Sequence, residues 1–472
     1  MLRAHTAVLL LAATFVSCSD SEHAAGLLGG NDRRDLILVS VDTMRASRLP
    51  FYSALHSEPR IPTAGDASQE FSIAWLAKQG LVYESAFATA GKTLPSLASF
   101  FTGLPPLEHG AVSNMTRLQA PTLTQNLKAA GFRSHARVAN RALHKFCGLA
   151  DGFSSYAVRA KQREPELGSD LLAAADNDIT SGHRVMLWAH FMAPHQPYEP
   201  LPQFRKSLGI ADDIVADNSS LESAHRSPQS QQHLFSAYRD LYDAELATAN
   251  LYVQQFLSQL DAKYRAANRG PLLDNAIVVF FSDHGEELAD RNGYFLHAKS
   301  LYSAVTQVPL IVVDKFGAAG QRDSSLVDLS QTMSSVLYGT PMAAETVVSA
   351  WHNDYFSIRD KRFTLVHNPQ QNPRGPIEPP VDVDYFYPAI ALYDRDSDPF
   401  ELTNIASEHP LVVKRLGREL FEWFESSNHQ AIESTDHLDE QALSELGYAD
   451  DPDEQANYEN VGPWHPQRYG DE

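Results

Sequence analysis

The chain of 472 residues is too long for one small core and predicts two or three domains, or one large domain with a smaller companion. Hydrophobic residues make up 43% and charged residues 21%, as in ordinary globular proteins. The formal net charge of −21 argues against a nucleic-acid partner, because phosphate backbones attract basic surfaces, but it leaves room for a small anionic substrate beside a cation.

The N-terminus has the pattern of an export signal. An apolar run from residue 7 to 16 is too short to span a bilayer as a helix, and it ends in small residues before Cys18. We predict a lipoprotein signal over residues 1–18 and a polar tether over residues 19–34. The protein would then be exported to the periplasm or cell envelope, with a lipidated Cys18 as membrane tether. The alternative is an ordinary cleaved signal in which this cysteine is incidental.

With only two cysteines, Cys18 and Cys147, we expect no disulfide framework, since removal or lipidation of the first leaves the second without a partner. A cysteine-rich zinc site is excluded for the same reason. Cys147 is expected to be a small packed residue.

Strands and helices alternate through most of the chain. Continuous aliphatic runs at residues 36–41, 185–190, 275–282 and 308–313 predict strands buried on both faces. Residues 95–102, 122–130 and 235–260 have helical spacing or helix-end signals. This order predicts an α/β fold, with a mostly parallel central sheet covered by helices on both faces. Ligands of such sheets collect beyond the carboxyl ends of the strands.

The composition and periodicity of the sequence change in two further regions. Residues 206–232 are polar with little periodicity and are expected to form an inserted surface loop. After a catalytic domain over residues 35–350, short strands and one helix predict a small C-terminal α+β subdomain over residues 351–430. Residues 431–472 read as an acidic tail.

Acidic and imidazole side chains follow two of the predicted strands. Asp42 comes directly after the first, and Asp283 and His284 end another. One such residue alone is more often a turn or helix cap. The set, at corresponding strand ends, favours a divalent metal ion, with Ca²⁺, Mg²⁺, Mn²⁺ and Zn²⁺ all open.

Thr93 lies at the predicted start of a helix, after Gly91 and Lys92. Free N–H groups and the positive end of the helix dipole favour anions there. A metal at its hydroxyl would lower the hydroxyl pKa and make an alkoxide available. The alternative is that Thr93 only caps the helix.

Six segments, in order, resemble the sulfatase family of the alkaline phosphatase superfamily. They are the opening strand Asp35 to Arg45, the nucleophile signature Thr93 to Gly110, the Pro-His-x-Pro-Tyr segment His190 to Tyr198, the second metal motif Ser282 to Glu286, the following segment His297 to Val312, and a C-terminal strand and turn from Leu392 to Asn404.

The resemblance implies a role for each matching residue. Asp42, Thr93, Asp283 and His284 would bind the metal, and Thr93 would also be the nucleophile. His195 would lie over the substrate oxyanion or leaving group, and His297 and Lys299 would contact substrate or complete a second metal site. Three nearby residues are not assigned to the site. Lys92 is expected to be exposed, although it could neutralise an anion, and His109 is expected to be structural. His190 fits the pattern, but a packed core histidine is an equal alternative.

The sequence departs from the family at the nucleophile. True sulfatases convert Cys or Ser into formylglycine, whereas the β-carbon of Thr93 carries a methyl group and would give a ketone. Leu97 and Thr43 replace the signature Arg and the second Asp of the family's Asp pair. The set therefore resembles the superfamily's Thr-dependent phosphohydrolases and phosphoglycerol transferases.

Three functions follow from these observations. The first is hydrolysis or transfer of a phosphate ester through a covalent Thr93 intermediate, and the second is hydrolysis of a sulfate ester without formylglycine. The third, from another class, is a catalytically inactive, surface-tethered binding protein.

Overall fold

The computed structural model describes residues 26–30, 32–52, 67–159, 164–291, 294–297, 300–317, 319–351, 355–368 and 388–430. The predicted signal with Cys18 and the predicted acidic tail lie outside these residues, as does Lys299. Within the described part, no helix is long and apolar enough to cross a membrane.

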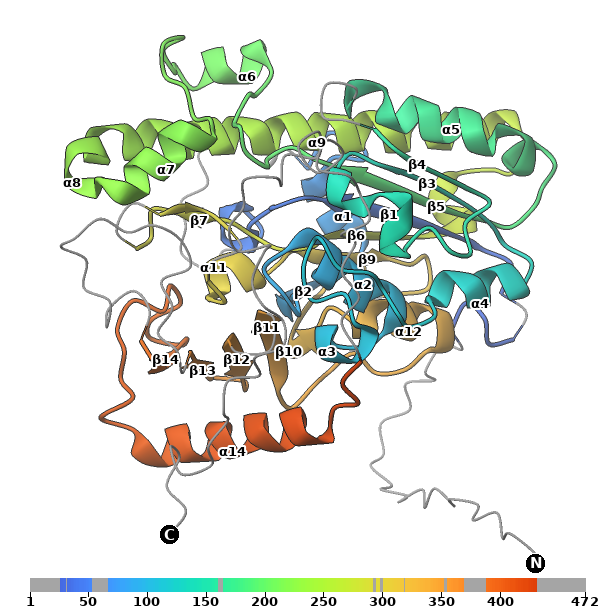
Figure 1. Cartoon of the computed structure of the whole chain (residues 1–472). Coiled ribbons are helices and arrows are strands. Elements are labelled where there is room, and N and C mark those ends of the chain that lie inside the picture. The colour runs from blue at the N-terminus through green and yellow to red at the C-terminus, as the bar shows by residue number, and fades with distance from the viewer. Residues whose placement is uncertain are drawn as a thin grey trace, which may run out of the picture.

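The core of the chain is an eight-stranded sheet in the order β10-β2-β9-β6-β1-β5-β3-β4 (Figure 1). Its strands are β1 (Asp35–Val41), β2 (Leu81–Phe87), β3 (Arg133–Val138), β4 (Ser155–Val158), β5 (Val185–Phe191), β6 (Ala276–Ser282), β9 (Leu310–Val313) and β10 (Arg322–Asp328). Only β9 runs antiparallel among these eight. The mostly parallel sheet predicted from the aliphatic runs is confirmed, and β1 lies at its centre, buried along its whole length.

Helices cover both faces of this sheet. One face packs against α1 (Ile73–Gln79), α5 (Glu164–Thr180) and α9 (Phe235–Ala266), and the other against α2 (Thr93–Thr102), α4 (Leu123–Ala129) and α12 (Gln331–Tyr338). Alternation along β1 divides its side chains accordingly: Val39 faces α9 and α5, while Leu38 faces α2. Polar residues that continue the Leu38 row are therefore directed toward the start of α2.

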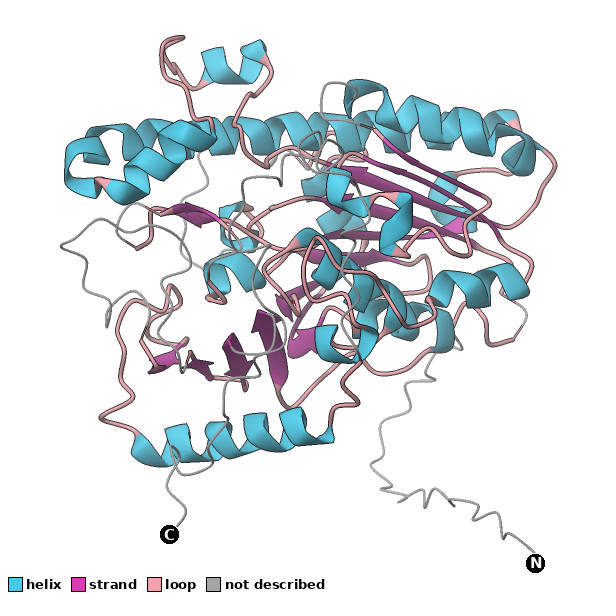
Figure 2. Ribbon diagram, viewed as in Figure 1, coloured by secondary structure: helices cyan, strands magenta, loops and turns pink. Residues whose placement is uncertain are grey.

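A second, antiparallel sheet forms the C-terminal subdomain (Figure 2). It consists of β11 (Val347–Trp351), β12 (Tyr355–Arg359), β13 (Phe363–His367) and β14 (Ile390–Asp394). The amphipathic helix α14 (Pro410–Ser426) packs on it through Leu416, Leu420 and Phe424. The first strand is tied to the main domain, because the amide of Ala350 donates to the Thr89 carbonyl at 2.8 Å.

Two local predictions were wrong. The polar segment 206–232 is largely helical, with α6 (Pro202–Ser207) leading into it, followed by α7 (Asn218–Arg226), α8 (Pro228–Gln231) and the start of a 3₁₀ turn (Gln232–Leu234). Its helices are short and lie mostly at the surface, so they leave a weak apolar pattern. Part of the predicted tether is packed: Leu27 is buried, and its amide donates to the Val336 carbonyl of α12.

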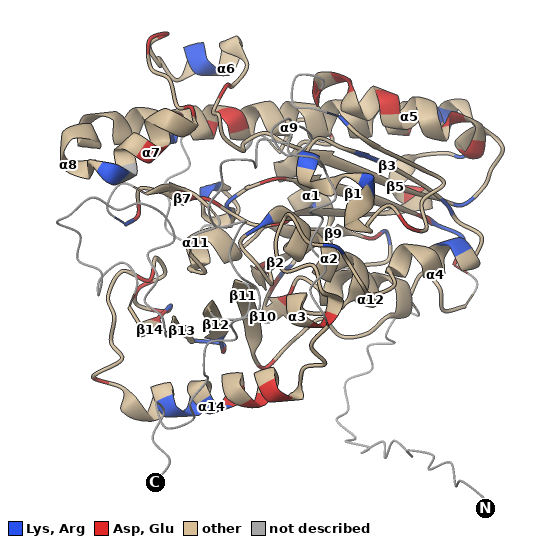
Figure 3. Cartoon of the chain, in the orientation of Figure 1, with Lys and Arg blue, Asp and Glu red and all other residues tan. Residues whose placement is uncertain are grey.

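The remaining short elements form the loops at the strand ends. They are β7 (Glu287–Leu288), β8 (Phe295–Leu296), α3 (Pro106–His109), α10 (Leu272–Asn275), α11 (Ser303–Thr306) and three further 3₁₀ turns at Ala46–Arg48, Arg141–Leu143 and Lys145–Cys147. Acidic and basic side chains are interspersed over the visible helices, and α5 carries acidic residues without a basic one (Figure 3).

Candidate active site

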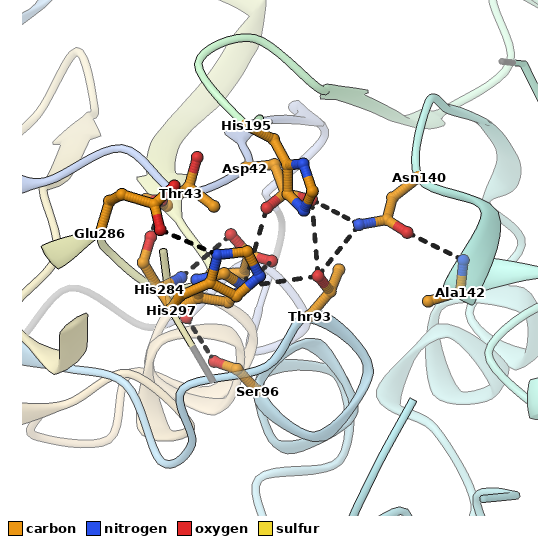
Figure 4. Close-up of polar contacts among 12 residues, drawn as sticks. Asp42, Thr43, Thr93, Ser96, Asn140, Ala142, His195, His284, Glu286 and His297 are labelled. Atoms are coloured by element: carbon orange, nitrogen blue, oxygen red, sulfur yellow. Dashed lines mark hydrogen bonds and ion pairs between the residues drawn. The ribbon is translucent and has the colours of Figure 1, made fainter. Parts of the chain in front are cut away.

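Polar side chains from three strand ends meet at the first turn of α2 (Figure 4). Asp42 follows β1, Asp283 and His284 follow β6, and Asn140 lies two residues beyond β3. In the sheet β6 is adjacent to β1, and β3 lies on the other side of β1, beyond β5. These strands are parallel, so their carboxyl ends reach one edge together. The fold thus assembles a site from residues up to 242 positions apart in the chain.

Thr93 is the first residue of α2 and its hydroxyl lies inside this cluster. Its Oγ1 is 3.5 Å from Oδ2 of Asp42 and 3.4 Å from Nε2 of His284. The side chain is 1% exposed. The helix is ten residues long and begins at Thr93, so the positive end of its dipole lies beside this hydroxyl and favours an anion there. Its Leu94 amide donates to Oδ1 of Asn114.

His284 presents an unprotonated nitrogen to this hydroxyl. Its Nδ1 lies 3.1 Å from the Gly285 carbonyl, which can only accept, so the ring hydrogen of the neutral imidazole is on Nδ1. Its Nε2 then carries a lone pair, 3.5 Å from Oδ2 of Asp283 and 3.7 Å from Oδ1 of Asp42. Burial lowers the pKa of His284, which favours this neutral form.

The two aspartates carry oxygens that lack hydrogen-bond donors. Oδ1 of Asp42 and Oδ2 of Asp283 are buried and accept no hydrogen bond within the described residues. Burial, together with the charge of Asp42, raises the pKa of Asp283 well above its usual range. Burial also opposes ionisation of Asp42, but the hydrogen bond from His190 and the charges of His195 and His284 outweigh it and lower its pKa. Two unsatisfied carboxylate oxygens beside an imidazole lone pair fit a divalent cation.

Two more imidazoles border the cluster. His195 follows β5, and its ring centroid is 4.9 Å from that of His297, which in turn is 4.5 Å from that of His284. Nδ1 of His195 donates to the Gln196 carbonyl at 2.7 Å, so Nε2 carries a lone pair in the neutral ring. Nδ1 of His297 is 3.0 Å from Oε1 of Glu286. Burial, reinforced by His284 and His195, lowers the pKa of His297 well below its usual range.

Lys92 is buried, at 4% exposure, which contradicts the expectation of an exposed lysine. It is the N-cap residue of α2, and its ammonium nitrogen lies 4.6 Å from the ring centroid of Trp351, the last residue of β11. The sequence could not predict this, because the tryptophan comes from the second sheet. A buried positive charge next to Thr93 adds to the attraction of the site for an anion.

The structure therefore brings together Asp42, Thr93, Asp283, His284, His195 and His297 from the predicted set, whereas Lys299 lies outside the described residues. His109 lies apart, buried and bonded to Ser99 and the Ala111 amide. Cys147 is buried too, and burial raises the pKa of its thiol to about 12.

Asn140 was missed by the sequence analysis. Its amide nitrogen donates to Oδ2 of Asp42 at 2.6 Å and to Oγ1 of Thr93 at 3.0 Å, while its carbonyl oxygen accepts from the Ala142 amide. The strand before it, β3, is rich in polar residues and was not among the predicted strands, so the sequence offered no signal for this asparagine. Such an amide could equally donate to an ester oxygen bound at Thr93.

Comparisons with known proteins identify the family of the chain. The Sulfatase family model matches residues 34–340. An ulvan-active sulfatase of Formosa agariphila is 23% identical over 77% of this chain and 72% of its own length, and a choline-sulfatase of Rhizobium meliloti is 21% identical over 50% and 48%.

Solved structures give the same fold. One, in complex with its substrate D-glucosamine-2-N,6-O-disulfate, superposes with a TM-score of 0.62 at 17% identity, covering 84% of this chain and 99% of that one. The phosphonate monoester hydrolase of Agrobacterium radiobacter has a TM-score of 0.57 at 16% identity, covering 83% and 95%. With its family model matched over well over half of its length, the chain belongs to the sulfatase family.

Proposed function

We propose that this sulfatase-family protein is a metal-dependent hydrolase or transferase of phosphate esters that works through a covalent Thr93 intermediate. The observation that carries the proposal is the position of the Thr93 hydroxyl, within 3.5 Å of both Asp42 and His284 at a helix N-terminus.

The cation would be held by Asp42, Asp283, His284 and Thr93, which supply hard oxygens and one imidazole nitrogen. Bound there, a divalent ion would lower the pKa of the Thr93 hydroxyl and offset the negative charge of the ester. The unsatisfied oxygens of Asp42 and Asp283 support this assignment.

The chain's own groups would carry the rest of the reaction. Thr93 Oγ1 gives its proton to the neutral ring of His195 or His297 and attacks phosphorus, the bond to the leaving alkoxide breaks, and the phosphoryl group remains on Thr93. Water, or an acceptor alcohol in a transferase, then attacks phosphorus and breaks the bond to Oγ1. The amide of Asn140, the buried Lys92 and the positive end of the α2 dipole would stabilise the non-bridging oxygens. The histidine that received the Thr93 proton would pass it to the leaving alkoxide.

The single hydroxyl of Thr93 favours a phosphate ester over a sulfate ester. A formylglycine hydrate has a second hydroxyl and can release sulfate by returning to the aldehyde. Thr93 has no second hydroxyl, so sulfate could leave a sulfated Thr93 only after a second attack on sulfur. In phosphoryl transfer, by contrast, both steps are attacks on phosphorus. A second candidate, sulfate-ester hydrolysis without formylglycine, is favoured by the names of the curated relatives.

The third function, an inactive binding protein, accounts less well for the site. Two buried carboxylate oxygens without donors destabilise the fold, and a binding protein would have no reason to retain them. We also propose that the protein works outside the cytoplasm, on the sequence pattern before Cys18 alone.

The test is turnover of an aryl phosphate monoester, an aryl phosphate diester, a phosphonate monoester and an aryl sulfate by the full-length protein loaded with Mn²⁺ or Zn²⁺. We expect Thr93→Ala to lower kcat on the best substrate by at least about 10³-fold, and Thr93→Ser to retain most of it. Rapid quenching should trap a phosphoryl group on residue 93. Undiminished turnover in Thr93→Ala would contradict the covalent mechanism, and turnover of the sulfate ester alone would establish the second candidate.

A further inference from the structure

His190 lies at the end of a hydrogen-bonded row that crosses from β5 to β1. It is fully buried and is paired in register with Ser40. Nε1 of Trp188 donates to Oγ of Ser40 at 2.9 Å, Oγ of Ser40 is 2.8 Å from Nδ1 of His190, and Nε2 of His190 is 3.3 Å from Oδ2 of Asp42. All four side chains lie on the face of the sheet that α2 covers.

The hydrogens in this row have only one arrangement that satisfies every group. The indole N–H of Trp188 can only donate, so Ser40 accepts from it. Within the described residues the Ser40 hydroxyl makes no further hydrogen bond beyond His190, so its own hydrogen is directed to Nδ1 of that ring. The ring hydrogen of His190 is then on Nε2, where it meets a carboxylate oxygen that can only accept.

In this arrangement the two carboxylate oxygens of Asp42 have different neighbours. Oδ2 accepts from His190 and, at 2.6 Å, from Asn140, whereas Oδ1 accepts no hydrogen bond and lies 3.7 Å from Nε2 of His284. We propose that His190 is a positioning residue, fixed by Ser40 and Trp188, that holds Oδ2 of Asp42 so that Oδ1 is presented to a divalent cation. The inference rests on the cation site of the proposed function but not on Thr93 as nucleophile.

The competing arrangement makes His190 itself a ligand. Asp42, His190 and Asp283 each offer a ligand atom within 4.8 Å of the others, which is close enough for one ion. That arrangement needs a lone pair on Nε2, and the Ser40 hydrogen at Nδ1 denies it. His284, whose ring hydrogen is held at Nδ1 by Gly285, has the opposite tautomer and the free Nε2.

The experiment measures the dissociation constant of Zn²⁺ by chelator competition in the full-length protein, with melting temperatures alongside. His190→Gln retains an amide N–H near the position of Nε2, while His190→Leu removes the donor. His135→Leu is the matched control, because His135 is another buried histidine that bonds an aspartate, Asp178 at 2.9 Å, outside the site.

We expect His190→Leu to weaken Zn²⁺ binding by about 10- to 100-fold, His190→Gln by less than about threefold, and His135→Leu not at all. Ser40→Ala should give an intermediate loss. Equal losses in the Gln and Leu variants, with a changed absorption spectrum of the Co²⁺-loaded protein, would make His190 a ligand and overturn the inference.

Unchanged metal affinity in His190→Leu, with only a lower melting temperature, would also overturn it and leave the proposed function intact. A wild-type protein that binds no Zn²⁺, Mn²⁺ or Co²⁺ would overturn both. Loss of turnover in Thr93→Ala is read separately, so the two proposals can fail independently.

Discussion

Individual histidines in this chain differ through the groups that hold their ring hydrogens. His284 and His195 donate Nδ1–H to backbone carbonyls, which places the lone pair of each neutral ring on Nε2. His190 has the reverse arrangement, and His109 accepts the Ala111 amide at Nδ1. The sequence shows only the residue type, so the motif could identify His284 but left His190 open between core and site.

The pH dependence of stability should be set in part by His109. Burial lowers its pKa to about 3 from an ordinary value of 6.5, so the unfolded chain binds a proton in acid that the folded chain does not. Its contribution is complete above pH 6.5 and is lost as the pH falls, by about 2 kcal/mol between pH 7 and pH 5.

Urea unfolding at the two pH values checks this expectation. In His109→Asn the side-chain oxygen can still accept from the Ala111 amide at 3.1 Å, and the decline in unfolding free energy should be shallower by that amount. An equally steep decline in the variant would assign the acid sensitivity to other groups.

At the scale of the elements, helices outside the site hold the loop that carries His195. Oε1 of Glu164, the first residue of α5, accepts from the amides of Met192 and Ala193 at 2.6 and 2.8 Å. Oε1 of Glu245 on α9 accepts from the Glu199 amide at 2.6 Å. The loop is therefore fixed at both ends by buried carboxylates, which orients His195 toward the cluster.

Glu164→Leu should release this loop and lower kcat by about tenfold for a substrate with a poor leaving group, with a smaller loss for a nitrophenyl ester. Glu164→Gln keeps a carbonyl acceptor and should retain activity. The exposed neighbour Glu166→Leu is the control. An equal loss of kcat for good and poor leaving groups would show that Glu164 does not act through protonation of the leaving group.

The elements themselves were predictable to the extent that their residues are buried on both faces. Aliphatic runs located β1, β5, β6 and β9 within two residues of their ends, and the apolar spacing located α9. The reversed direction of β9 was not predictable, because the direction of pairing leaves no mark in a strand buried on both faces. The surface helices α7 and α8 were missed because polar residues dominate them.

At the scale of the whole molecule, the smaller sheet contributes to the site of the larger one. The ring of Trp351, at the end of β11, lies beneath the Lys92 ammonium, and Ser349 in the same strand donates to the Ala88 carbonyl. The C-terminal subdomain therefore supports the segment that leads into α2. Sequence motifs could place Thr93 but gave no sign of this contact between distant segments.

Trp351→Leu should remove the ring beneath the Lys92 ammonium, a contact worth about 1 to 2 kcal/mol, and raise KM for an anionic ester by about five- to thirtyfold. Trp351→Phe keeps an aromatic face and should stay within about threefold of the wild type. Steady-state kinetics with parallel melting curves test this. A fall in melting temperature with an unchanged KM would limit Trp351 to packing.

The threonine at the start of α2 also has a consequence for how this protein becomes catalytically active after synthesis. Conversion of a Cys or Ser side chain into the aldehyde of formylglycine is an oxidation after translation, so such a site needs an oxidising step before it can react. Threonine is complete when it leaves the ribosome. Under the proposed chemistry, protein from any expression host should reach full specific activity once refolded with its cation, without a maturation partner.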